Sequence, residues 1–183
     1  ALALVDIRVE LPRFDDVAFW EVFAAVAREA GIDAVVPVRN EELPHWAHRA
    51  EAGALPARLM ISSERALRLC LDKAALYTAA ESAGIRCPSW QPVNAWIAGS
   101  AGEFPVILKP VSGSGSRGVR VVRDSNELAR WSEHLDRPYL VQKRIVGTEF
   151  SVDCFANGTG LLDAVCVRER TQVDHGQCTI GTP

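Results

Sequence analysis

The 183-residue sequence lacks the features that mark several common protein classes. Its five cysteines show no CxxC spacing, which argues against a disulfide framework or a zinc site and favours reduced, mostly buried thiols. No apolar run approaches the length of about eighteen residues that a membrane span needs, and the N-terminus has no basic segment typical of a signal peptide. The net charge is only -3, without blocks of like charge, so attraction to nucleic acid or to an anionic membrane is not expected. We therefore expect a cytoplasmic protein with no nucleic-acid partner and no membrane partner.

The first third of the sequence alternates strand and helix patterns. An amphipathic helix is expected between an N-cap at Asp15 and a stop at Gly31, and a second helical segment, 41–53, contains a break at Pro44. Three apolar runs have strand character, and they cover residues 2–11, 32–38 and 57–63. Because strands separated by helices form parallel sheets, this part predicts an α/β unit.

The pattern changes after residue 62, and we place the main boundary at about Pro88. One or two helices are expected over 63–84, with Gly84 as the stop. Beyond Pro88, one helix among five strands predicts an α+β unit with an antiparallel sheet, and Asn157-Gly158 is expected to form a hairpin turn. The strand candidates are 105–111, 118–124, 139–146, 149–158 and 161–170, and the helix candidate is 125–135.

The segment 112–118, SGSGSRG, contains only serine, glycine and one arginine. Its GxGxxG pattern precedes VRVV and not a helix, which argues against a Rossmann loop, and Gly118 is followed by Val119, which excludes a Walker A loop. A protein kinase carries its lysine on a later strand and needs HRD and DFG motifs, which the sequence lacks. A plain flexible hairpin connection is the remaining alternative.

Lys109 comes three residues before the loop, on the strand that leads into it. Such a lysine can hold a fixed charge against a phosphate, while glycines let successive backbone N–H groups converge on the same oxygens. The combination favours a phosphate-binding loop.

An ordered series of motifs resembles the ATP-grasp superfamily, in particular its carbamoyl-phosphate-synthase and biotin-carboxylase-like branch. The motifs are IDAVVPVRNEEL, LDKAALYTAAESAGIRCP, FPVILKPVSGSGSRGV, YLVQKRIVGTEFSVD and LLDAVCVRER. The resemblance implies an α/β plus α+β fold, in which a partial Rossmann-like domain precedes an incomplete ATP-grasp fold with an antiparallel sheet. It assigns 1–62 to the partial Rossmann-like domain, 63–88 to a helical linker with the first lysine, and 89–183 to the ATP-grasp domain with an incomplete C-terminal lobe. It also implies a fragment truncated at both ends.

The same resemblance implies roles for individual residues. Lys73 and Lys109 would contact ATP phosphates beneath a mobile lid, Glu149 would bind the ribose hydroxyls, and Arg168 or Arg170 would lie near the transferred phosphoryl group as the catalytic cation. The lid residues expected to bind the nucleotide are Ser112, Gly113, Ser114, Gly115, Ser116 and Gly118, and the adenine hinge is Gln142, Lys143, Arg144 and Ile145. Many family members have glutamate where Gln142 stands. Mg²⁺ is expected as a second cofactor, with its ligands beyond Pro183 and none within this sequence.

The resemblance implies that the parent protein is an ATP-dependent ligase, which joins a carboxylate to an amine or similar nucleophile through an acyl phosphate. Its partners would be ATP and an unidentified carboxylate-bearing small molecule, and a homo-oligomer is left open. Two alternatives remain: a non-catalytic nucleotide-binding module that has lost the metal ligands, and a kinase-like phosphotransferase. The 183 residues alone are expected to be inactive.

Overall fold

The computed structural model describes residues 6–99, 103–174 and 177–182. The chain forms two compact units, Ala1–Leu71 and Asp72–Pro183, and each is described by itself. The division falls inside the segment 63–88 that the sequence assigned to a linker, and the three-part domain assignment stays a prediction. Within the described residues, none of the helices has the length and apolar character that crossing a membrane requires.

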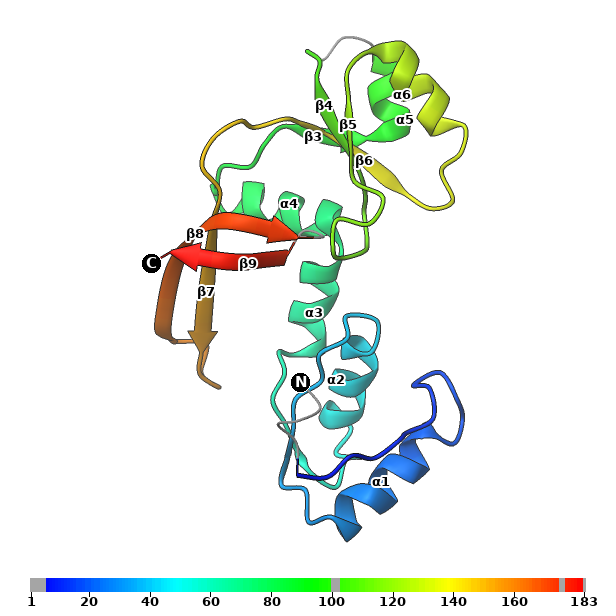
Figure 1. Ribbon diagram of the computed structural model, residues 1–183, viewed down its shortest axis with the longest axis vertical. Coiled ribbons are helices and arrows are strands. Elements are labelled where there is room, and N and C mark those ends of the chain that lie inside the picture. Colours follow the sequence, from blue (N-terminus) through cyan, green and yellow to red (C-terminus); the bar gives the residue numbers. More distant parts are fainter. Residues whose placement is uncertain (1–5, 100–102, 175–176, 183) are drawn as a thin grey trace. The chain divides into compact units, whose positions relative to one another are not determined.

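The first unit contains three helices and two short strands (Figure 1). Its elements are α1 (Phe19–Glu29), β1 (Ala34–Val35), α2 (Leu43–Glu51), β2 (Arg58–Leu59) and α3 (Glu64–Leu71). The strands β1 and β2 pair in parallel, as the alternation of strands and helices predicted. Aromatic side chains fill the core, where the rings of Phe19 and Phe23 meet the Trp46 ring edge-on at centroid distances of 5.8 Å and 4.8 Å.

Several local expectations in the first unit are corrected. Asp15 does not cap α1, because its carboxylate pairs with Arg13, and the neighbouring Asp16 instead accepts a hydrogen bond from the amide of Ala18 at 2.8 Å. Pro44 lies in the first turn of α2, where its missing N–H costs nothing, and so it does not break the helix. The described part of the strand candidate 2–11 contains no strand, and residues 2–5 lie outside the described residues. Gly31 follows α1 with φ +63°, which confirms it as the stop.

The second unit begins with α4 (Lys73–Ser82), for which the Asp72 side chain is the N-cap. A four-stranded antiparallel sheet follows in the order β3-β6-β4-β5, and a separate three-stranded antiparallel sheet has the order β7-β8-β9. The remaining elements are β3 (Trp90–Pro92), α5 (Val93–Gly99), β4 (Val106–Pro110), β5 (Arg120–Val122), α6 (Ser125–Ser132), β6 (Tyr139–Lys143), β7 (Phe150–Ala156), β8 (Leu162–Asp174) and β9 (Gln177–Thr182). The sequence analysis did not anticipate β3, α5 or β9.

One face of the four-stranded sheet packs against α5 and α6 (Figure 1). Alternate residues of β4 face this core, and the side chains of Val106 and Leu108 are fully buried there, together with Leu128 of α6. The intervening residues Ile107 and Lys109 therefore lie on the opposite face. This alternation sets the direction in which Lys109 projects.

The expectation of mostly buried thiols is wrong for the described cysteines. Cys70, Cys154 and Cys166 are exposed, Cys87 is half-buried, and all four are free. The side chain of Cys178 lies outside the described residues.

Candidate functional site

Lys109 lies near the end of β4, on the face of the sheet opposite its helical core. Its ammonium donates a hydrogen bond to the hydroxyl of Tyr77 in α4 at 2.6 Å and lies 5.0 Å from the centroid of the Tyr77 ring. The Tyr77 hydroxyl in turn donates to Oε1 of Gln142 on β6 at 2.9 Å. Two of the residues that the sequence assigned to the site are thus connected through a third that it did not assign.

Lys73 is placed by the start of α4. Asp72 caps the helix by accepting a hydrogen bond from the amide of Ala75 at 2.9 Å, which fixes the first turn. The backbone N–H of Lys73 donates to the carbonyl of Val111 at 3.0 Å, and its ammonium donates to the carbonyls of Val111 and Gly113 at 3.3 Å and 3.0 Å. The first predicted lysine therefore lies at the base of the loop that follows the second.

The loop 112–118 joins the antiparallel strands β4 and β5 and has an unusual backbone. Gly113, Gly115, Ser116 and Gly118 all have positive φ, at +138°, +63°, +53° and +77°. Glycine adopts such angles without strain, which explains why the loop is rich in it. Backbone N–H groups in turns of this kind form the concavities of known anion-binding loops.

The two lysines lie close enough for their charges to interact, and Asp72 partly offsets the repulsion at Lys73. Neither forms an ion pair with a carboxylate within the described ranges. Burial lowers the pKa of Lys109 below its usual value, and burial together with the charge of Lys109 lowers the pKa of Lys73. Burial also raises the pKa of Tyr77, so that its hydroxyl stays protonated. An anion placed between the lysines would offset the cost of keeping both charged.

The predicted hinge begins on β6 and, like the predicted ribose-binding residue Glu149, extends into the connection between β6 and β7. Lys143 ends β6, and its backbone N–H donates to the carbonyl of Ser89 at 2.8 Å, while Arg144 and Ile145 follow as exposed residues. Glu149 and Arg170 come together, since the Arg170 Nε lies 3.4 Å from the Glu149 carboxylate.

Arg168, the other predicted catalytic arginine, pairs with an acid of its own sheet. Its guanidinium donates twice to the carboxylate of Asp153, at 2.8 Å and 2.6 Å. Each predicted catalytic arginine thus has an acidic partner in the ligand-free chain.

Tyr77 is the functional candidate that sequence reasoning missed. It lies four residues after Lys73 on α4, and this spacing places both side chains on the same helix face. That spacing was the available signal, but nothing local indicated that Lys109, 32 residues away, would meet the hydroxyl.

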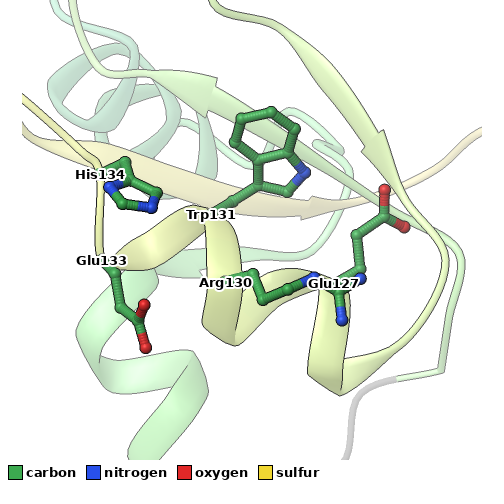
Figure 2. Close-up of a pocket in the computed structure, with 5 residues that line it drawn as sticks. All are labelled: Glu127, Arg130, Trp131, Glu133 and His134. Carbon is green, nitrogen blue, oxygen red and sulfur yellow. The ribbon is translucent and has the colours of Figure 1, made fainter.

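A hollow of about 440 Å³ lies along α6 and the turn after it, as Figure 2 shows. The Trp131 ring lies 3.7 Å from the guanidinium carbon of Arg120, which gives it a packing role. The lining residues are Glu127, Arg130, Trp131, Glu133 and His134, none of which belongs to the predicted site.

Two histidines of the first unit, His45 and His48, form local contacts. His48 pairs through Nδ1 with the Glu64 carboxylate at 3.2 Å, and the His45 ring packs against Phe14. In the part of the chain that the structure describes, no group of three or more His, Cys, Asp or Glu side chains could hold a metal ion. The pair therefore serves local contacts.

Comparisons with known proteins identify the family of the chain. The family model of the ATP-grasp domain matches residues 70–181. A putative D-alanine–D-lactate ligase of Streptomyces coelicolor is 29% identical over 161 residues, which cover 81% of this chain and 44% of the relative. The vancomycin/teicoplanin A-type resistance protein VanA of Enterococcus faecium is 28% identical over 99 residues, covering 51% of this chain and 29% of that protein. The chain thus spans less than half the length of these curated relatives.

Solved structures share the fold. An L-amino acid ligase from Bacillus licheniformis aligns with a TM-score of 0.67 and 22% identity, covering 88% of this chain and 39% of that protein. The biotin carboxylase domain of the 2-oxoglutarate carboxylase from Hydrogenobacter thermophilus, solved as a dimer with MgADP and bicarbonate, aligns with a TM-score of 0.73 and 22% identity, covering 93% and 41%. These alignments, with the parallel pairing of the first unit and the antiparallel sheets of the second, confirm the expected fold class. The chain belongs to the ATP-grasp domain family.

Proposed function

We propose that this chain forms the ATP-binding part of an ATP-dependent ligase that joins a carboxylate to an amine or a thiol. The observation that carries the proposal is the placement of two partly buried lysines, neither of which forms an ion pair among the described residues: Lys109 on the strand that enters the Ser/Gly loop, and Lys73 bonded to the carbonyls of Val111 and Gly113 where the loop starts. The proposal concerns the activity of a whole protein, whereas this chain covers less than half the length of the relatives it matches.

The predicted residues divide the work of nucleotide binding. Lys73 and Lys109 contact the phosphates, and the loop 112–118 closes over them and supplies backbone N–H groups. The backbone of 142–145 offers its amides and carbonyls to the adenine edge, and Glu149 accepts hydrogen bonds from the ribose hydroxyls. Nucleotide binding would then compete with the pairing of Glu149 to Arg170.

The proposed reaction has two steps. An oxygen of the substrate carboxylate attacks the γ-phosphorus of ATP, and the bond to the bridging oxygen breaks to release ADP and leave an acyl phosphate. The amine or thiol then attacks the acyl carbon, and inorganic phosphate leaves. Arg168 or Arg170 stabilises the charge on the transferred phosphoryl group, and the closed loop excludes the water that would hydrolyse the acyl phosphate.

Magnesium bound with a nucleotide is usually held by one or two carboxylates together with phosphate oxygens and water. In the described ranges Asp153 is engaged with Arg168, and no group of three or more His, Cys, Asp or Glu side chains could hold a metal ion. The ligands of a magnesium ion that would accompany ATP therefore stay a prediction.

The substitution Lys109→Ala tests the proposal. In the protein that carries this chain, we expect it to weaken ATP binding or turnover at least tenfold, which corresponds to about 1.4 kcal/mol. Arg137→Ala removes an exposed cation that pairs with Asp136, and it serves as the matched control. Wild-type affinity and turnover in Lys109→Ala would remove this lysine from the site.

A trapping experiment tests the reaction class. Hydroxylamine converts an acyl phosphate to a hydroxamate, so incubation with ATP and candidate carboxylates should yield a hydroxamate together with ADP. Nucleotide binding without any carboxylate-dependent release of ADP would favour the non-catalytic module instead.

A further inference from the structure

The Tyr77 hydroxyl is the centre of a hydrogen-bond chain that links three elements of the second unit. Lys109 of β4 donates to it at 2.6 Å, and it donates to Oε1 of Gln142 on β6 at 2.9 Å. Lys109 and Gln142 lie on the paired strands β4 and β6, while Tyr77 reaches them from α4. These hydrogen bonds therefore join the helix that carries Lys73 to the strand that carries Lys109.

The chemistry of the three groups allows only one donor-to-acceptor direction for these hydrogen bonds. An ammonium can only donate hydrogen bonds, so the Tyr77 oxygen must accept from Lys109. The single phenolic proton then remains for Gln142, and the amide must turn its oxygen toward Tyr77. The Tyr77 hydroxyl satisfies one of the three N–H bonds of Lys109 and leaves the other two for a ligand.

A second contact fixes the ring itself. Tyr77 packs against Trp90 at a centroid distance of 5.7 Å, and the Lys109 ammonium lies 5.0 Å from the Tyr77 ring centroid. These contacts belong to the ring and would survive loss of the hydroxyl. The hydroxyl can thus be tested apart from the packing.

We propose that Tyr77 is a positioning residue, whose hydroxyl holds the Lys109 ammonium and the Gln142 amide in the arrangement that receives the nucleotide. This role rests on the proposed function, because it assumes that Lys109 binds a phosphate of the nucleotide. A lysine side chain is a flexible four-carbon stem, so a fixed acceptor reduces the conformations that phosphate binding would otherwise have to restrict. Since Lys73 and Tyr77 lie one turn apart, α4 orders both the base of the loop and the second lysine.

The test compares Tyr77→Phe with Ser82→Ala in the full chain. Tyr77→Phe keeps the ring and removes the hydroxyl, while Ser82→Ala removes an exposed hydroxyl of the same helix that bonds only to the carbonyl of Thr78. The first readout is the pKa of Lys109, measured by NMR on lysines labelled with ¹³C, and the sequence contains only three lysines to assign. The second is the affinity for adenylyl imidodiphosphate, with Lys109→Ala measured in parallel.

We expect Tyr77→Phe to lower the pKa of Lys109, because the ammonium loses an acceptor that favours its charged form. We also expect it to weaken analogue binding by roughly tenfold, as loss of a charge-assisted hydrogen bond does. Ser82→Ala should change neither quantity. Gln142→Leu, which removes the far acceptor and leaves Tyr77 in place, should shift the Lys109 pKa in the same direction by less.

The outcomes separate this role from the proposed function. An unchanged Lys109 pKa in Tyr77→Phe overturns the positioning role, whatever the affinity. Analogue binding that is lost in Lys109→Ala but retained in Tyr77→Phe also overturns it, and leaves the proposed function standing. Binding that is unaffected in both variants overturns the proposed function and this role with it.

Discussion

The ammonium of Lys73 donates a hydrogen bond to the carbonyl oxygen of Gly113 at 3.0 Å, across 40 residues of sequence. It donates a second bond to the carbonyl of Val111, which also accepts from the Lys73 backbone N–H. Because an ammonium has three N–H bonds, the carbonyls of Val111 and Gly113 occupy two of them. A phosphate that binds Lys73 therefore takes the remaining donor or displaces the loop, and either way the lysine connects ligand binding to the loop.

Lys73→Met should loosen the loop and weaken nucleotide binding together. The methionine side chain has a similar length but cannot donate hydrogen bonds to the carbonyls of Val111 and Gly113. We therefore expect faster amide hydrogen exchange over 113–116. We expect affinity for ATP to fall roughly tenfold, about 1.4 kcal/mol. Hydrogen exchange with mass spectrometry and a binding titration measure the two effects. Arg130→Met, on the exposed surface of α6, is the control, and unchanged loop exchange in Lys73→Met would refute the anchor.

The pH dependence of nucleotide binding should begin at lower pH than for ordinary lysines. Burial lowers the pKa of Lys73 and of Lys109 below 10.5, so the free chain loses these charges before an unfolded chain does. Affinity for an ATP analogue should therefore fall as the pH rises through the lowered pKa values, because in our proposal the phosphates bind the charged lysines. A titration between roughly pH 7 and pH 10 measures it.

The same pKa shifts affect stability with the opposite sign. In the unfolded chain both lysines stay protonated up to a pH of about 10.5. Between the lowered pKa values and pH 10.5 the unfolded chain therefore binds more protons than the folded chain. The free energy of unfolding consequently increases as the pH rises through this range. In Lys109→Ala, part of the pH dependence of nucleotide affinity and part of the pH dependence of stability should disappear. Identical pH profiles in the variant and the wild type would show that Lys109 does not titrate in this window.

Some of the site could be predicted because its signal is local. The sequence placed Lys109 on a strand, and the alternation of a strand puts it on the face opposite Val106 and Leu108, which the structure buries fully. The role of Tyr77 could not be predicted in this way, because its partners Lys109 and Gln142 are 32 and 65 residues away. Only the sheet pairing of β4 with β6 brings these two close to each other, and no local pattern specifies it.

The missed elements have equally physical causes. β3 contains only three residues, too few for an alternating pattern, and is identified by its pairing with β6 at the sheet edge, where Pro92 is tolerated. Asp15 was assigned as the cap of α1 because aspartate is a good capping residue. Its carboxylate instead pairs with Arg13, and the helix begins at Phe19 without a side-chain cap.

Asp124→Ala should destabilise the second unit through α6. Asp124 accepts a hydrogen bond from the amide of Glu127 at 2.8 Å, and the Glu127 side chain accepts from the amide of Arg123 at 2.7 Å. The helix also carries Leu128 into the core. We therefore expect the free energy of unfolding, measured by urea titration, to fall by about 1 kcal/mol. Asp136→Ala removes an exposed acid outside any helix and should have little effect. Equal stability of the two variants would contradict the capping role.

Gly118→Ala should be more damaging than other Gly→Ala changes in this chain, because two independent constraints act on the residue. Its φ of +77° favours glycine, and an added methyl group would lie 2.7 Å from the Tyr139 hydroxyl oxygen and 3.0 Å from Cγ of Pro110. The left-handed backbone and the crowding each cost roughly 1–2 kcal/mol, so we expect a loss near 2 kcal/mol or more in a urea titration.

The matched control for Gly118→Ala is Gly147→Ala, where no atom lies within 4 Å of the added methyl and φ is not positive. We also expect weaker ATP binding in Gly118→Ala but not in the control, since the residue ends the loop that we propose contacts the phosphates. Wild-type stability in Gly118→Ala would mean that this end of the loop can shift away from Tyr139, in which case the loop is not fixed where it joins β5.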